Sequence, residues 1–200
     1  MIKAVIFDVG GVIVSNEMES VYEDIKGTFG IDTPTFEKAW TELMPLLGTG
    51  KITEDIFWKE FLEITHSSKS LPEQSLLSRK YLELTKLNTQ TIEIAKKLVD
   101  DGYQIALLSN TIKAHVDINS SLGFFEIFDT KIFSNEVGMR KPDPQIFQLA
   151  LKRLGRLPHE AIFIDDDETY VSAACKLGII GIIYKNIPQL KSDLTQALNK

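Results

Sequence analysis

The sequence predicts an α/β fold, namely a doubly wound, mostly parallel five-stranded sheet with a helical insertion after its first strand. Five short apolar runs do not alternate with polar residues, which is typical of parallel strands covered on both faces. From about residue 90 onward these runs alternate with segments of helical periodicity. That order of elements is the one found in doubly wound sheets.

The expected strands are mostly rich in β-branched and aromatic residues. They cover residues 2–7, 103–108, 130–133, 161–164 and 179–184.

Helices are expected between the later strands because helix-stop glycines follow the periodic segments. These segments are 91–101 before Gly102, 144–154 before Gly155 and 168–177 before Gly178, with a further amphipathic helix over 189–200. Asp143 is suited to cap the second of these helices, and Pro144 fits its first position.

The spacing of apolar residues between the first two expected strands predicts four helices and no strand. They are expected to open near residue 18, at Thr33–Pro34, at Thr53 and at Pro72. We therefore expect a core of residues 1–15 and 87–200 and a helical insertion of residues 16–86. The interpretation of the apolar residues at helical spacing is that they form the core of a helix bundle. Among them are Met18, Val21, Tyr22, Ile25, Phe29, Phe36, Trp40, Leu43, Met44, Leu47, Phe57, Phe61 and Tyr81.

Composition sets limits on the function. The net charge of -6 gives no electrostatic reason to expect nucleic acid or an anionic membrane as a partner. Cys175 is the only cysteine, so an intramolecular disulfide is excluded, and we expect this residue to pack in the interior. With neither a secretory signal nor an apolar run long enough to cross a membrane, we expect a cytoplasmic monomer or homodimer.

Polar residues follow four of the expected strands at the point where each apolar run stops. They are Asp8, the pair Ser109–Asn110, Lys141 and the pair Asp165–Asp166. Each could be an ordinary cap or turn residue taken alone. Because binding sites in open parallel sheets lie at the carboxyl ends of the strands, the four together indicate one site.

The four segments resemble the motifs of the haloacid dehalogenase superfamily. FDVGGV is similar to the first motif, LLSNT to the second, GMRKPDPQIF to the third and IFIDDDETYVSAACKLG to the fourth. The helical insertion resembles the C1 cap of subfamily I, and TGKITEDIFW resembles a stretch of such caps. The FDxGxV form of the first motif is similar to that of a subgroup containing sugar-phosphate phosphatases.

The resemblance implies a magnesium-dependent phosphatase that acts on a small phosphorylated metabolite, such as a sugar phosphate or a nucleotide. Asp8 would be the nucleophile that forms an aspartyl-phosphate. Two carboxylates and a phosphate repel each other unless a cation lies between them, and oxygen ligands are those that Mg²⁺ prefers. The implied metal ligands are Asp8, the backbone carbonyl of Gly10 and Asp166, with Asp165 supporting the metal through water or orienting Lys141.

The phosphate would be bound by Ser109, the backbone N–H of Asn110 and Lys141, a compact positive charge that also takes part in catalysis. The family often has a cis bond between this lysine and the following proline, so we expect a cis bond between Lys141 and Pro142.

Gly10 departs from the family pattern, because most phosphatases of the family carry an aspartate there as general acid and base. A positioned acid or base contributes roughly 10²–10⁴ in rate. Two alternatives therefore stay open: a 2-haloacid dehalogenase, which needs neither that acid nor a metal, and a catalytically weak binding or regulatory protein. Asp165 and Asp166 argue against the dehalogenase, since such enzymes typically lack paired carboxylates in the fourth motif.

Two smaller expectations concern residues outside these motifs. His66, His115 and His159 show no metal-ligand spacing, so we expect structural or surface roles for them. Asn16 and Glu17 lie where the insertion begins, and we expect them to face the substrate.

Overall fold

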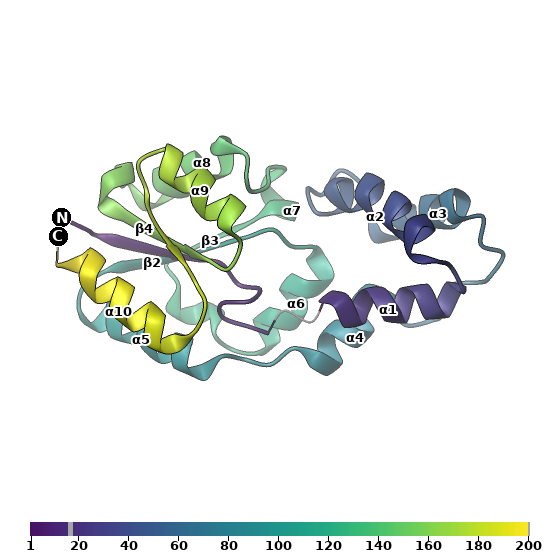
Figure 1. Cartoon of the computed structure of the whole chain (residues 1–200), viewed down its shortest axis with the longest axis horizontal. Helices are drawn as coiled ribbons and strands as arrows, with labels where there is room; N and C mark the ends of the chain where they lie inside the picture. The colour runs from purple at the N-terminus through teal and green to yellow at the C-terminus, as the bar shows by residue number, and fades with distance from the viewer. Residues whose placement is uncertain (16–17, 200) are drawn as a thin grey trace.

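A parallel five-stranded sheet forms the centre of the molecule in the computed structural model, which describes residues 1–15 and 18–199 (Figure 1). Its strand order is β3-β2-β1-β4-β5. All four strand pairings are parallel, so the predicted fold class is confirmed, with a fully parallel sheet where a mostly parallel one was expected. The strands are β1 (Ala4–Phe7), β2 (Gln104–Ser109), β3 (Thr130–Phe133), β4 (Ala161–Asp165) and β5 (Ile180–Ile183).

The strands stop nearly level with one another because of their register. Phe7 lies beside Leu107 of β2 and beside Ile164 of β4. The residues that directly follow β1 and end β2 and β4 therefore emerge at the same edge of the sheet. This edge faces the helical insertion (Figure 1).

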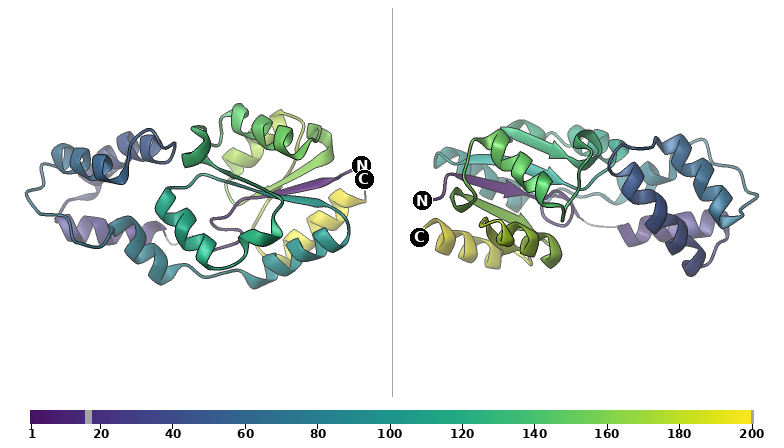
Figure 2. Two further views of the ribbon diagram at one scale, coloured as in Figure 1. Left: turned by 180° about the vertical axis from the view of Figure 1, so that it is seen from behind. Right: turned by 90° about the horizontal axis from the view of Figure 1, so that it is seen from above.

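Helices cover both faces of the sheet (Figures 1 and 2). Side chains of successive strand residues point to opposite faces, so Val5 and Phe7 pack on one side and Ala4 and Ile6 on the other. The first side is covered by α5 (Thr89–Asp100) and α10 (Ile187–Leu198), and the second by α8 (Pro144–Leu154) and α9 (Glu168–Lys176). The remaining core elements are α6 (Lys113–Ser121), η1 (Phe125–Ile127), α7 (Ser134–Val137) and η2 (Pro158–Glu160).

The helical insertion consists of α1 (Met18–Phe29), α2 (Thr33–Leu47), α3 (Glu54–Thr65) and α4 (Leu76–Leu84). Its four helices match the number predicted. The expected start of the fourth helix at Pro72 is wrong: α4 begins at Leu76, because the hydroxyl of Ser75 accepts a hydrogen bond from the backbone N–H of Ser78 at 3.2 Å. The exact domain boundaries at residues 16 and 86 stay a prediction.

Two further expectations concern the surface. Among the described residues, no helix is both long and apolar enough to cross a membrane. The expected burial of Cys175 is wrong, because its side chain is exposed. α9 packs on the sheet through Val171 and Ala174, while Cys175 lies on the flank of the helix beside β5, an edge strand with no further strand next to it.

Candidate active site

The end of β1 places Asp8 at the edge of the sheet that faces the insertion. The backbone N–H of Asp8 donates to the carbonyl of Ile164 at 2.8 Å, so the pairing with β4 continues for one residue past the strand. Ser109 is the last residue of β2, and Asp165 is the last residue of β4. The three side chains are therefore brought together by strands that are distant in sequence.

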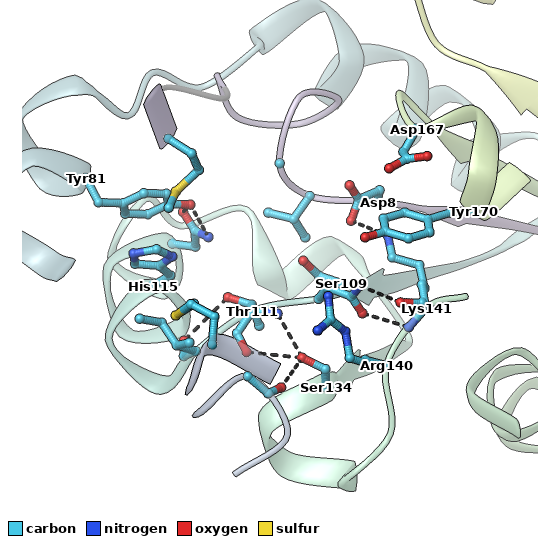
Figure 3. A pocket seen from close by; sticks show the side chains of 18 of the residues that line it. Asp8, Tyr81, Ser109, Thr111, His115, Ser134, Arg140, Lys141, Asp167 and Tyr170 are labelled. Atoms are coloured by element: carbon cyan, nitrogen blue, oxygen red, sulfur yellow. Dashed lines mark hydrogen bonds and ion pairs between the residues drawn. The ribbon is translucent and has the colours of Figure 1, made fainter. Parts of the chain in front are cut away.

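Lys141 reaches this edge from the loop between α7 and α8. Its Nζ lies 2.8 Å from Oδ1 of Asp8 (Figure 3). The same Nζ lies 2.5 Å from Oδ2 of Asp165. The side chain of Asn110 fixes the lysine backbone, since its Oδ1 accepts from the Lys141 N–H at 2.8 Å and its Nδ2 donates to the Lys141 carbonyl at 2.9 Å. The bond between Lys141 and Pro142 is cis, as the resemblance led us to expect.

The electrostatics of the site follow from burial and from crowded like charges. Burial lowers the pKa of Lys141, but the carboxylates of Asp8 and Asp165 outweigh this effect and raise the pKa overall. Burial and the charge of Asp8 raise the pKa of Asp165 to about 7, against the opposing effect of Lys141. Burial and Asp8 likewise raise the pKa of Asp166. One ammonium is thus too little positive charge for three neighbouring carboxylates.

A divalent cation fits this arrangement. Asp8, Asp165 and Asp166 each offer a carboxylate oxygen, and these oxygens lie within 4.8 Å of one another. An all-oxygen set of ligands suits Mg²⁺. Asp165 has its side chain fully buried and paired with Lys141, whereas Asp166 is exposed and lines the cavity in front of Asp8.

A cavity of about 590 Å³ lies between the sheet edge and the insertion. The predicted site residues that line it are Asp8, Gly10, Ser109, Asn110, Lys141 and Asp166. Asp165 is absent from this lining; its carboxylate accepts from Lys141 and from the backbone N–H of Asp167, the latter at 2.9 Å. Asn16 and Glu17, which we expected to face the substrate, lie outside the described residues.

Several residues of the cavity wall were not predicted from the sequence to line a site. Tyr81 and His115 stack with ring centroids 3.7 Å apart, on the side of the cavity opposite Asp8 and Lys141 (Figure 3). Burial lowers the pKa of His115 to about 4, so this side chain is neutral near pH 7, and its Nε2 lies 2.9 Å from the carbonyl of Leu77. This structural role agrees with the prediction for the histidines. Arg140, Tyr170 and Asn119 also line the cavity.

The predicted bundle core of the insertion is present, but it does not enclose every apolar residue at helical spacing. Most are buried in one cluster, but four others are only half-buried and line the cavity. The reason is that the insertion borders the core, where α4 packs on α6, so side chains at the margin of its apolar faces reach the cavity. These four residues, called the roof below, are Met18, Tyr22, Trp40 and Met44.

Comparison with known proteins agrees with this geometry. A family model described as haloacid dehalogenase-like hydrolase matches residues 2–178. The chain is 26% identical to the D-ribitol-5-phosphate phosphatase of Bacteroides thetaiotaomicron, with all of both chains covered. It is 31% identical to mouse acyl-CoA dehydrogenase family member 10, over 88% of this chain but only 17% of the relative's length.

A solved structure shares both the core and the insertion. It is a HAD family enzyme of Bacteroides thetaiotaomicron in complex with magnesium and inorganic phosphate. The TM-score is 0.78 at 25% identity, with 92% of this chain and 95% of the other covered.

Proposed function

The chain belongs to the haloacid dehalogenase-like hydrolase family, and from this premise we propose that it is a magnesium-dependent phosphatase acting on a small phosphorylated metabolite. The observation that carries the proposal is the position of Asp8. Its carboxylate lines the cavity, contacts the buried ammonium of Lys141 at 2.8 Å and lies in one cluster with Asp166. The similarity to a phosphatase over the whole chain supports it.

In the first step, a carboxylate oxygen of Asp8 attacks the phosphorus of the ester. The new bond joins that oxygen to phosphorus, and the bond from phosphorus to the substrate's leaving oxygen breaks. Lys141 provides positive charge beside the attacking group, and the hydroxyl of Ser109 and the N–H of Asn110 donate to the phosphate oxygens. In the second step, water attacks the phosphorus of the aspartyl-phosphate and releases phosphate and the free Asp8 carboxylate.

The metal would be held by Asp8, the backbone carbonyl of Gly10 and Asp166. When bound, Mg²⁺ supplies the positive charge that lets an anionic carboxylate approach an anionic phosphate. Asp165 acts through its ion pair with Lys141, which fixes the direction of the ammonium.

Gly10 is the observation that favours a second candidate, a protein of this fold that binds phosphate compounds but hydrolyses them slowly. No carboxylate at position 10 is present to protonate the leaving oxygen or to activate the water. The dehalogenase alternative is weaker, because its chemistry uses no metal and leaves the cluster of Asp8, Asp165 and Asp166 without a purpose.

The proposal is tested by assaying phosphate release from a metabolite panel with Mg²⁺, using Asp8→Asn and Asp117→Asn as a matched pair. Asp117 is an exposed carboxylate of α6 that pairs with Lys113 outside the cavity. We expect Asp8→Asn and chelation each to abolish turnover and Asp117→Asn to keep it. Turnover that survives Asp8→Asn refutes the nucleophile, and turnover insensitive to chelation refutes the metal. Tight phosphate binding without turnover of any ester identifies the second candidate.

A further inference from the structure

The two ends of the cavity differ in chemistry. The end at the sheet carries the charged side chains, including Asp8, Asp166, Arg140 and Lys141. The side chains that the insertion contributes to the lining are those of the roof, which are apolar or aromatic, and that of Tyr81. No charged side chain of the insertion is among the described residues that line the cavity. A phosphate bound near Asp8 therefore directs its leaving group toward an apolar surface.

The roof is held in place by the bundle behind it. The ring of Tyr22 packs edge-on against Trp40 with centroids 4.8 Å apart, and Trp40 stacks on Phe36 at 5.0 Å. Phe36 is buried within the insertion, whereas Tyr22 and Trp40 are only half-buried and border the cavity. The roof is thus a surface of aromatic and thioether groups. One side of it packs on the helix bundle, and the other side borders the cavity, where a ligand can contact it.

Most polar side chains between the roof and the phosphate end already have partners within the protein. The hydroxyl of Tyr81 and the amide of Asn119 bond each other at 2.9 and 3.1 Å. Ser15, Ser134 and His115 bond backbone groups. A polyhydroxy leaving group would lose its hydrogen bonds to water here and regain few of them from the protein, which disfavours its binding.

We propose that the substrate of this site is a phosphate monoester whose leaving group is a planar, largely apolar ring system that packs against the roof. This inference rests on the proposed function, since it assumes that phosphate binds beside Asp8. Aromatic rings pack favourably against Tyr and Trp side chains and against methionine sulfur. A cavity of about 590 Å³ can hold such a ring together with the phosphate.

The test compares esters of alcohols and avoids aryl esters, because aryl esters would be favoured by their activated leaving group alone. With Mg²⁺ present, kcat/KM is measured for 2-naphthylmethyl phosphate and for D-ribitol 5-phosphate, both esters of primary alcohols. Binding without turnover is measured by calorimetry for 2-naphthylmethylphosphonate and methylphosphonate. We expect kcat/KM to be at least tenfold higher for the naphthyl ester than for ribitol phosphate. We expect the affinity to be at least tenfold higher for the naphthyl phosphonate than for methylphosphonate.

Variants of Met44 test whether the roof provides this preference. Met44→Gln keeps the length of the side chain but makes it polar, and we expect it to reduce the preference at least threefold. Met44→Leu is expected to retain the preference, as is Leu82→Gln, which makes the same change at an exposed residue of α4 outside the cavity. Thermal unfolding of each variant shows whether it is folded. The two ligand comparisons use the unaltered protein, so they test the inference even if a variant fails to fold.

Equal or weaker binding of the naphthyl phosphonate than of methylphosphonate overturns the inference, and so does a higher kcat/KM for ribitol phosphate. Tight ring-dependent binding without hydrolysis of any ester supports the inference while refuting the phosphatase proposal, so the two failures are distinguishable.

Discussion

Gly11 lies against the carboxylate of Asp166, so closely that a Cβ at position 11 would overlap with the side-chain oxygens. Gly11 also has a φ of +78°, a left-handed conformation that costs other residues about 1–2 kcal/mol. We expect Gly11→Ala to displace Asp166, to lower the affinity for Mg²⁺ at least tenfold and to destabilise the fold by about 1 kcal/mol. Magnesium titration of the activity, together with denaturant unfolding, measures both effects.

Gly10→Ala is the matched control for this change. A Cβ at position 10 meets nothing within 4 Å, and Gly10 has no positive φ. We expect its affinity for Mg²⁺ to change less than twofold. An equal loss of Mg²⁺ affinity in the two alanine variants would show that the overlap of residue 11 with Asp166 does not cause the loss.

Gly10→Asp should restore the missing general acid and base, because open space is available for a side chain at this position. A proton donor helps most when the leaving group is a poor one. We therefore expect kcat for alkyl phosphates to rise at least tenfold, and kcat for an activated aryl phosphate to change little. Steady-state kinetics on both esters provides the comparison, with Gly10→Asn as the control of equal size. A gain of the same size in the Asn variant would contradict an acid–base role.

The stability of the protein should decrease in mild acid because of His115. Burial lowers the pKa of this histidine from its ordinary 6.5 to about 4, so the unfolded chain takes up a proton at a higher pH than the folded protein does. The contribution of the neutral, buried His115 to the free energy of unfolding is therefore complete above pH 6.5 and is lost as the pH falls toward 4. It amounts to about 3 kcal/mol, at 1.4 kcal/mol for each pKa unit.

His115→Phe removes this proton uptake and should flatten the pH dependence of the free energy of unfolding between pH 6.5 and 4. The exposed His159→Phe is the control and should leave the slope unchanged. Denaturant unfolding at several pH values measures the slopes, and an unaltered slope in His115→Phe would contradict the assignment.

The sheet and the meeting of Asp8, Lys141 and Asp165 were predictable because they follow from local signals. Apolar runs without alternation indicate buried parallel strands, and polar residues at the end of such runs lie at one edge when the strands share a direction. The cis bond at Pro142 followed from the resemblance. The roles of Asp8, Ser109, Asn110, Lys141 and Asp166 in the chemistry stay predictions.

The roof was not predictable, because helical spacing gives the same signal for a side chain that faces a bundle core and for one that faces a cavity. Trp40 and Met44 share their helix with the buried Phe36 and Leu43, and only in the folded protein do the first two border the cavity while the other two are enclosed. Tyr81 belongs to the bundle core as predicted, but its ring also stacks on His115 and borders the cavity, which the spacing does not reveal. Contacts between two domains are non-local and leave no periodic pattern in the sequence.

Ser134 joins the insertion to the core and provides a final prediction. Its hydroxyl donates to the carbonyl of Gly48 at 2.5 Å and accepts from the N–H of Thr111 at 2.9 Å. Beside it, a Cβ on Gly50 would collide with the carbonyl of Asn135, so this loop of the insertion lies directly on the core. Ser134→Ala leaves two backbone groups without their partner, which costs about 1–3 kcal/mol.

We expect the loop to detach more often in Ser134→Ala, because this hydroxyl is the polar link between the loop and the end of β3. Hydrogen exchange at residues 48–51 should become several-fold faster, and KM should rise severalfold because the cavity closes less completely. Ser172→Ala, at an exposed serine of α9, is the control and should change neither quantity. If exchange at residues 48–51 stayed at the rate of the unaltered protein, the hydroxyl of Ser134 would not be what holds this loop against the core.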